Sequence, residues 1–287
     1  MRSTTATPGA VCNAFTVDVE DYFHVQGFAQ TVHRRDWDHY ELRVVHSTHR
    51  ILRLLQKHNI QGTFFVLGWV AQRCTDLVRD IQKDGHEIGS HSYWHRLIYE
   101  MTPEDFAADL RRSCEVLSDV TGQPVTSFRA PSFSITRRSL WALDVLFDQG
   151  IRFDSSIFPV RHDVYGIPDA ERFPHAIVAR GTESLWEFPP AVRRYGRFNL
   201  PVAGGGYFRL FPAALSIHLL REINRAGQPF AFYIHPWELD PDQPRLGVPL
   251  KSRFRHYQNL KSSEAKLGQL LGAFSFGTIT TSLTAAK

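Results

Sequence analysis

Short hydrophobic runs alternate along the chain with longer segments that have helical spacing. In residues 46–59, for example, Ile51, Leu54 and Leu55 fall on one face of a predicted helix. The runs that predict strands cover residues 13–19, 62–68, 86–91, 125–131, 185–189 and 229–238. The segments that predict helices cover residues 46–59, 70–85, 103–122, 136–150 and 212–226. This repeated order of strand and helix predicts a parallel β/α architecture.

The chain has 287 residues and no glycine fingerprint for dinucleotide binding. We therefore expect an α/β fold in the form of a distorted (β/α) barrel rather than an open doubly wound sheet. Residues 155–207 lack helical periodicity and are predicted to form loops and β-structure on one face. Residues 239–287 hold a proline-rich connection and then a helix. The expected organisation is a barrel domain over residues 1–238 and a C-terminal helical extension, residues 239–287, packed on the same domain.

Composition and charge narrow the class of protein. Hydrophobic residues make up 43% of the chain and charged residues 22%, as in ordinary globular proteins. The net charge of +4 comes without a long basic block, so we expect no nucleic-acid partner. Cys12, Cys74 and Cys114 are too few and too far apart for a disulfide framework or a cysteine zinc site.

The chain shows no hydrophobic stretch of about 18 residues and no N-terminal run of signal-peptide length. These features predict a cytoplasmic protein without an integral membrane segment, at most peripheral to the inner membrane. The sequence makes no prediction of the oligomeric state.

Polar side chains follow four of the predicted strands. In a parallel β/α barrel the C-terminal ends of the strands meet on one face, which is where function sits. The side chains at these ends are Asp18, Glu20 and Asp21 after the first strand, His91 and His95 after the third, Arg129 after the fourth and His235 after the last. Each group alone also fits an ordinary role, such as a surface acid cluster or a core histidine. Four such ends on one face predict a site.

The residue types suggest metal-assisted acid–base chemistry. Asp18 and Glu20 point to the same side of an extended strand, where two carboxylates repel unless a cation lies nearby. One could bind a metal while the other acts as a base. His91 and His95, four residues apart, could bind the same ion from one helical turn, with nitrogen ligands that suit zinc and other first-row metals.

The two remaining residues complete the predicted acid–base set. A buried Arg129 needs a carboxylate partner, for which Asp18 is the natural choice. His235 is a candidate general acid.

With these residues in hand, the sequence resembles the polysaccharide deacetylase family, the NodB-homology carbohydrate esterases. The resemblance rests on four motifs in the family's order and spans about residues 13–238. They are TVDVED (16–21), HSYWH (91–95), RAPSF (129–133) and FYIHPW (232–237). The chain looks most like the branch associated with bacterial exopolysaccharide gene clusters, which carries an extra C-terminal segment. The resemblance implies a distorted barrel of the NodB-homology type.

The resemblance also implies an activity: metal-dependent removal of an N-acetyl, or O-acetyl, group from a sugar of a bacterial polysaccharide or its lipid-linked precursor. The partner would be an acetylated glycan. Asp18 would be the general base, Arg129 would orient it, and His235 would protonate the leaving amine.

The ion would be held by His91 and His95 with Glu20 or Asp21. Glu20 is favoured because the Asp18-x-Glu20 spacing keeps both groups on one strand face. The cofactor would be one divalent ion, zinc, with cobalt, nickel or manganese as alternatives.

Other residues receive supporting roles from the resemblance. Candidates to contact the sugar are Trp94, Pro131, Phe133, Tyr207 and Trp237. Asp154 or Glu187 would tune the acidity of His235. Two other classes of protein stay open: a metal-independent amide hydrolase of allantoinase-like type, and a non-catalytic glycan-binding module.

Overall fold

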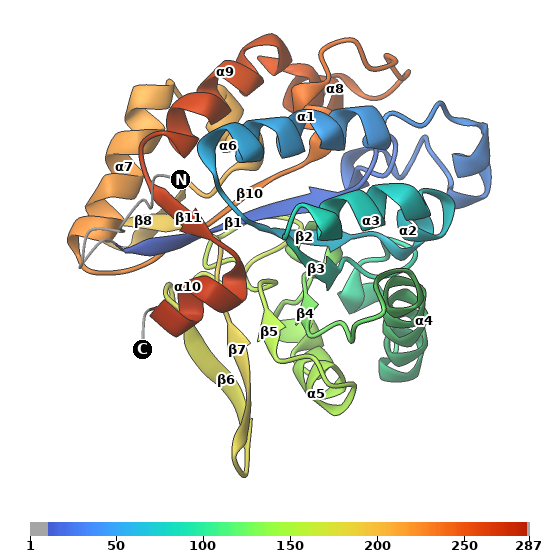
Figure 1. Ribbon diagram of the computed structural model, residues 1–287, viewed down its shortest axis with the longest axis horizontal. Coiled ribbons are helices and arrows are strands. Elements are labelled where there is room, and N and C mark those ends of the chain that lie inside the picture. The colour runs from blue at the N-terminus through green and yellow to red at the C-terminus, as the bar shows by residue number, and fades with distance from the viewer. Residues whose placement is uncertain (1–10, 286–287) are drawn as a thin grey trace.

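The computed structural model describes residues 11–285, and its centre is a mainly parallel sheet surrounded by helices (Figure 1). The strands are β1 (Cys12–Val19), β2 (Thr63–Val66), β3 (Glu87–Ser90), β4 (Ser127–Phe128), β5 (Phe153–Asp154), β6 (His175–Arg180), β7 (Glu183–Glu187), β8 (Val192–Tyr195), β9 (Phe198–Pro201), β10 (Ala231–Ile234) and β11 (Ser275–Gly277). The large sheet has the order β10-β1-β2-β3-β4-β5-β7-β6, and β11 also pairs with β1. Only the β6–β7 pair of this sheet is antiparallel.

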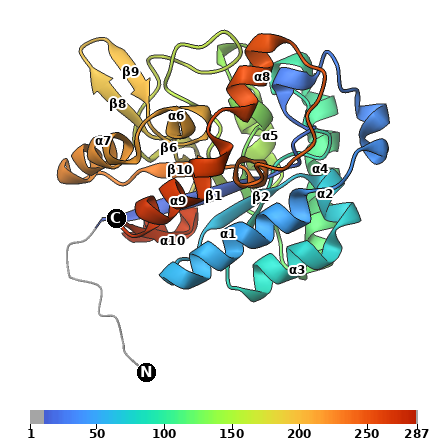
Figure 2. The ribbon, with the colours of Figure 1, turned by 90° about the horizontal axis from the view of Figure 1, so that it is seen from above.

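The two ends of the strand order in this sheet approach each other, so that the sheet is curled. An isolated parallel bridge joins Pro190, just after β7, to Ala231 of β10. In Figure 2 the helices lie around the strands rather than in two layers above and below a flat sheet. The architecture is the expected α/β fold, in which parallel strands curl around an interior and helices cover the outside.

The helices begin and end largely where the sequence indicates. They are α1 (Val44–His58), α2 (Gly68–Arg73), α3 (Thr75–Lys83), α4 (Pro103–Thr121), α5 (Ala142–Asp148), α6 (Gly205–Leu210), α7 (Ala213–Arg225), α8 (Leu250–Tyr257), α9 (Leu260–Leu271) and α10 (Ile279–Ala285). At the start of α4, Thr102 Oγ1 accepts the N–H of Asp105 at 3.1 Å, as expected of an N-cap. The single helix expected over residues 70–85 is wrong, because the chain leaves the helical conformation at Cys74.

Residues 155–207 form mostly β-structure and loops, as predicted: the β6–β7 hairpin and the separate β8–β9 hairpin. The C-terminal residues contain more structure than the single expected helix, since α8, β11 and α10 accompany α9. β11 pairs with β1, and α10 packs against it. The C-terminal segment is therefore built into the sheet, while the division at residue 238 stays a prediction.

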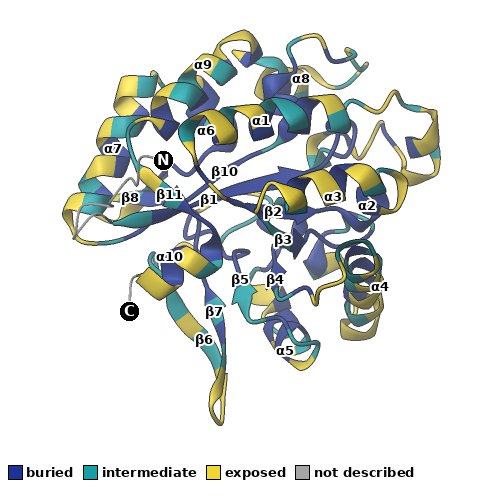
Figure 3. Cartoon of the chain, viewed as in Figure 1, coloured by how far each residue is buried: buried dark blue, intermediate teal, exposed yellow. Residues whose placement is uncertain are grey.

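Because side chains alternate along β1, its two faces pack into different hydrophobic clusters. Phe15 and Val17 belong to the large hydrophobic cluster under the outer helices. Ala14, on the opposite face, packs with Phe65 and Ala231 of neighbouring strands and with side chains of α10, which fill one end of the barrel interior. Figure 3 shows the central strands β1, β2 and β10 as buried, whereas β6 and the outward faces of the helices are partly or fully exposed. Residues 16, 18 and 20 share the face of Ala14, so the strand aims them into the barrel.

None of the helices in residues 11–285 combines the length and the apolar character that crossing a membrane requires.

Gly204 provides a test of this packing. Its φ is +147°, and a Cβ added there would lie 1.8 Å from the Tyr233 backbone oxygen of β10. We predict that Gly204→Ala lowers the free energy of unfolding by roughly 3 kcal/mol, from backbone strain and the clash. Gly206→Ala is the control, because its Cβ would meet only Arg209 Nη2 at 3.9 Å. Urea unfolding of both variants measures the difference, and equal stability would contradict the close approach of Gly204 to β10.

Candidate active site

Arg129 and Asp18 form a buried ion pair inside the barrel. Arg129 Nη1 donates to Asp18 Oδ1 and to Thr16 Oγ1, both at 2.7 Å. Its Nε and Nη2 donate to the backbone oxygen and the hydroxyl of Ser155, at 3.0 and 2.7 Å. Arg129 is 0% exposed and Asp18 2%. One oxygen of Asp18 is thereby fixed, and the other faces His235 Nε2 at 3.8 Å.

Glu20, His91 and His95 form the second part of the site. One ligand atom from each lies within 4.8 Å of the others, and all three residues are buried. Glu20 Oε2 is 2.6 Å from His95 Nε2, yet it accepts no aligned hydrogen bond from the described residues. Burial alone would raise the pKa of Glu20, but the surrounding histidines, His95 first, hold that pKa well below its usual range.

The tautomer of His91 suits metal binding. Its Nδ1 donates to the backbone oxygen of Arg129 at 2.8 Å, and because a carbonyl oxygen only accepts, Nε2 of the neutral ring carries a free lone pair. Burial is the main reason that the pKa of His91 falls to about 4, so the ring is neutral at pH 7. Two imidazoles and a carboxylate that already converge are a donor set that fits zinc or another first-row divalent ion.

The loop that carries both histidines is not the expected helical turn. Ser92 and His95 have positive φ values of 63° and 53°. The Asp109 carboxylate accepts the N–H groups of Tyr93 and Trp94 at 2.7 and 3.2 Å. Ser92 Oγ accepts the N–H of His95 at 3.1 Å. Left-handed backbone at non-glycine residues is strained and needs such support, so α4, which carries Asp109, helps to set the position of the histidines.

Asp21 does not join the cluster, which corrects its place among the candidate metal ligands. Its Oδ1 accepts the N–H of Tyr22 at 2.8 Å, and its Oδ2 accepts those of Arg43 and Val44 at 2.7 and 2.8 Å. These last two N–H groups lie at the start of α1, where helix N–H groups lack partners. Burial raises the pKa of Asp21 to about 6. Asp21 therefore ties the end of β1 to α1.

His235 follows β10 and is held by a residue that the sequence did not single out. Glu238 Oε1 accepts from His235 Nδ1 at 2.8 Å and from its backbone N–H at 3.0 Å. His235 Nε2 faces Glu20 Oε1 at 3.7 Å. Burial alone lowers the pKa of His235, but the hydrogen bond to Glu238 and the nearby carboxylates outweigh it and raise that pKa to about 9. The imidazole is therefore protonated at neutral pH.

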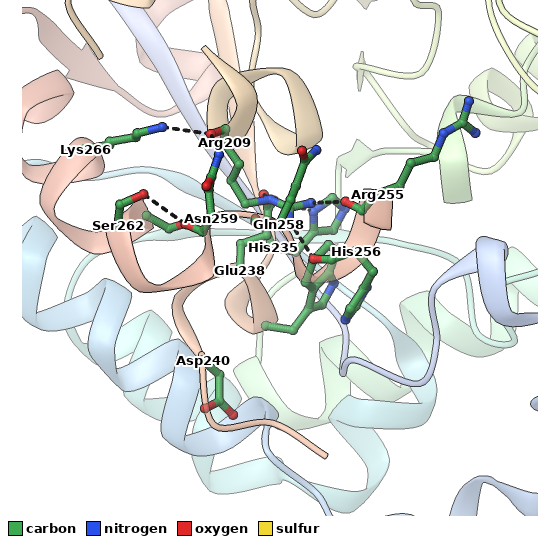
Figure 4. Close-up of polar contacts among 12 residues, drawn as sticks. Arg209, His235, Glu238, Asp240, Arg255, His256, Gln258, Asn259, Ser262 and Lys266 are labelled. Atoms are coloured by element: carbon green, nitrogen blue, oxygen red, sulfur yellow. Dashed lines mark hydrogen bonds and ion pairs between the residues drawn. The ribbon is translucent and has the colours of Figure 1, made fainter. Parts of the chain in front are cut away.

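Arg209 of α6 holds Glu238 in turn, and Figure 4 shows how the C-terminal segment surrounds it. Arg209 Nε donates to Glu238 Oε2 at 2.7 Å, and both residues are buried. The other guanidinium nitrogens donate to the backbone oxygens of Arg255, His256 and Gln258, at 2.6–3.1 Å. The spacing His235-x-x-Glu238 was a possible sequence signal for Glu238, whereas Arg209 lies 26 residues before His235 and had none.

Asp154 and Glu187, the acids expected to tune His235, lie elsewhere, since Glu238 holds the Nδ1 of that histidine. They form a buried pair on the adjacent strands β5 and β7. Ser156 Oγ donates to Asp154, and Glu187 Oε1 accepts the N–H of Ile157 at 3.0 Å. Burial raises the pKa of Asp154 to about 6, and burial with the Asp154 charge raises that of Glu187 well above its usual range. Asp154 is adjacent to Ser155, whose backbone oxygen and hydroxyl accept from Arg129. The pair therefore supports the end of β5, the strand that leads to Ser155.

The residues expected to contact a sugar differ in their freedom to do so. Trp237 is buried, stacks on His235 and donates to Glu20 Oε1 at 3.2 Å. It therefore supports the side chains of the site from the protein interior. Phe133 is 6% exposed, packs against Tyr233 and has a positive φ of 52°. Pro131 is also buried, whereas Trp94 and Tyr207 are partly exposed.

Two regions of the chain match family models. Residues 37–146 match the family model described as polysaccharide deacetylase, and residues 155–284 match a domain of unknown function, DUF3473. The chain is 31% identical over 101 residues to a peptidoglycan-N-acetylglucosamine deacetylase of Bacillus cereus, covering 35% of this chain and 37% of that protein. It is 28% identical over 108 residues to a peptidoglycan deacetylase of Helicobacter pylori, covering 38% and 36%. The chain thus spans little more than a third of the length of these relatives.

Solved structures show the same fold. A Mycobacterium smegmatis protein assigned to the polysaccharide deacetylases superposes with a TM-score of 0.64 at 19% identity, over 98% of this chain and 92% of that one. A CE4 family pseudoenzyme from Bacillus anthracis superposes with a TM-score of 0.51 at 15% identity, over 96% and 66%. At these identities the likeness concerns the fold alone.

The Asp154–Glu187 pair makes stability depend on pH. Because both folded pKa values are raised, the stability that the protonated pair provides is complete below about pH 4 and is lost as the pH rises through about 6. We predict that Asp154→Asn, which removes one ionisation, gains stability relative to the parent protein as the pH rises from 4 to 7. Urea midpoints across this range measure it, with the exposed Asp119→Asn as control. A difference that does not change with pH would contradict the prediction.

Proposed function

We propose that this chain, a member of the polysaccharide deacetylase family, hydrolyses acetyl groups on a carbohydrate with one divalent metal ion. The observation that carries the proposal is the convergence of Glu20, His91 and His95 at the barrel end where Asp18 and His235 also lie. Zinc is the ion that this donor set fits first, with cobalt, nickel and manganese as alternatives. When bound, such an ion polarises the acetyl carbonyl and acidifies a water molecule.

Side chains and backbone groups of this chain carry out the proton transfer, the positioning of the base and the stabilisation of the negative oxygen. Asp18 is the general base that takes a proton from the attacking water, through the oxygen that Arg129 leaves free. Arg129 holds Asp18 in place through the ion pair between Nη1 and Oδ1. The N–H of Ser132 is a candidate to stabilise the negative oxygen that develops on the acetyl group, whereas the N–H of Phe133 already donates to the backbone oxygen of Ala130 at 3.0 Å.

His235 completes the reaction as a general acid. Its Nδ1 is occupied by Glu238, so the proton that it gives to the leaving nitrogen comes from Nε2, the atom that faces Asp18 and Glu20. Because its pKa is raised to about 9, the ring carries that proton at neutral pH. A base that is ionised and an acid that is protonated at the same pH are what the hydrolysis of an amide requires.

Two alternatives lose support from the same contacts. A metal-independent amide hydrolase would have no use for two buried histidines that converge on a carboxylate. A glycan-binding module would not need a buried Arg–Asp pair and a protonated histidine beside it, although the related pseudoenzyme fold shows that the architecture alone does not guarantee catalysis. An N-acetyl group on a bacterial polysaccharide or its lipid-linked precursor is the substrate we propose, with O-acetyl as the alternative. The cytoplasmic location stays a prediction.

The choice of metal carboxylate can be tested with adjacent residues. We predict that Glu20→Gln loses both the bound divalent ion and acetate release, because one of three ligands is gone. Asp21→Asn, its neighbour, should keep the ion, because that carboxylate binds backbone N–H groups at α1. Metal content of the purified proteins and acetate release from acetylated chito-oligosaccharides measure both effects. Retention of the ion by Glu20→Gln and its loss from Asp21→Asn would reverse the assignment.

The role of His235 can be separated from metal binding by the choice of substrate. We predict that His235→Ala keeps the ion and loses about 10²–10⁴-fold in kcat on an amide, because the leaving nitrogen must be protonated. The loss on an activated acetyl ester should be much smaller, since such a leaving group departs without a proton. Equal losses on the two substrates would remove the acid role from His235.

A further inference from the structure

A cavity of about 380 Å³ lies beside His95, formed mainly by the segment that connects β1 to α1. This volume is within the usual range of small-molecule sites, roughly 300–1,000 Å³. Phe23 and Trp37 supply a buried aromatic wall. Among the described residues, the cavity is lined by His33, Arg34 and Arg35 but by no carboxylate. The polar lining therefore combines Gln26 with basic side chains and contains no acidic one.

His24, which also lines the cavity, offers a hydrogen-bond donor without an acceptor. Its Nδ1 accepts the N–H of Asp21 at 2.8 Å, and burial lowers the pKa of the ring well below its usual value. The single proton of the neutral ring is then on Nε2. That atom is buried, in a residue that is 4% exposed, and has no hydrogen-bond partner within residues 11–285. A buried N–H of this kind is normally satisfied, so a ligand oxygen is the expected partner.

Arg34 adds a positive charge to the cavity, and Asp109 and Glu100 are near enough to interact with it but not to form an ion pair. Its Nε donates to the backbone oxygen of Trp94 at 2.9 Å, which holds the guanidinium next to the histidine-bearing loop. Unlike Arg35, which lies 3.8 Å from Asp36, Arg34 forms no ion pair with any described residue. A planar guanidinium with free N–H groups suits the two oxygens of a carboxylate or a phosphate.

We propose that this cavity binds an anionic group, a carboxylate or a phosphate, on or next to the acetylated sugar. The inference rests on the proposed deacetylase function and specifies its substrate class. Arg34 would bind the anion at the rim, and the His24 Nε2–H would donate to an oxygen of the same ligand deeper in the cavity. Because His95 belongs to both the cavity and the metal cluster, the anionic group would lie beside the acetyl group that is cleaved.

The first experiment compares three probes on the metal-loaded protein. They are chitotetraose, which is neutral, a tetrasaccharide of alternating glucuronate and N-acetylglucosamine, and N-acetylglucosamine 1-phosphate. Binding is followed by ligand-observed NMR, and acetate release by initial rates. We expect the carboxylate probe, the phosphate probe or both to bind about five-fold more tightly than the neutral probe of the same length or, for the monosaccharide, than N-acetylglucosamine. The probe that shows the preference identifies the source of the anion.

Variants then test whether the tighter binding of an anionic probe depends on the cavity. Arg34→Gln should abolish the difference in affinity between the anionic and the neutral probe, and Arg34→Lys should retain part of it. Arg111→Gln, which removes the same charge from an exposed position on α4 outside the cavity, is the matched control. His24→Asn keeps an acceptor for the N–H of Asp21 and removes the Nε2 donor, so it should weaken binding of the preferred probe.

The outcomes separate this inference from the proposed function. Deacetylation of chitotetraose with no preference for either anionic probe, or a preference that survives Arg34→Gln, would overturn the anion site and leave the deacetylase in place. Tight, Arg34-dependent binding of an anionic probe without acetate release from any substrate would instead count against the deacetylase while supporting the anion site.

Discussion

Two buried carboxylates on one strand face, Asp18 and Glu20, impose the constraint on which this site depends. They are only 2% and 3% exposed, and unpaired charges at such depth would strongly destabilise the fold. Asp18 is compensated by Arg129, which is 0% exposed and enters from the end of β4. Glu20 forms no ion pair with a lysine or arginine among the described residues. It faces histidines and accepts from Trp237 Nε1, an arrangement that a divalent ion would complete. The carboxylate hydrogen-bonded to His235, together with the charges of Glu20 and Asp18, outweighs the effect of burial and raises the pKa of His235 to about 9.

The polar interactions that support the charged groups of the site extend well beyond the barrel end. Glu238 fixes His235, and Arg209 fixes Glu238. Arg209 in turn depends on backbone oxygens in the last turn of α8, and its own backbone oxygen accepts from Lys266 at 2.8 Å. The residues that match DUF3473 thus contain both the proposed acid and the segment that positions it. This gives the C-terminal region a physical part in the site, in addition to its pairing with β1 through β11.

The sequence predicted the parts of this structure that follow from local pattern. The alternation along β1 put Asp18 and Glu20 on one face, and the strand ends identified Arg129 and the histidines. It could not predict the break at Cys74, because the hydrophobic spacing continues through it. Nor could it exclude Asp154 and Glu187 as partners of His235, since each of them ends a strand, although the spacing His235-x-x-Glu238 was a possible signal for Glu238. Arg209 and His24 depend on contacts between distant segments, for which the spacing of residues along the chain carries no signal.

The central claim is that Glu20, His91 and His95 hold one divalent ion. Anomalous diffraction from crystals of the protein loaded with zinc tests it most directly, because it locates the ion without relying on activity or on a variant that folds. We expect one strong peak, bonded to a carboxylate oxygen of Glu20 and to Nε2 of both histidines, about 2.0–2.2 Å from each. A peak bonded to Asp21 instead, or no peak among these three residues, would contradict it.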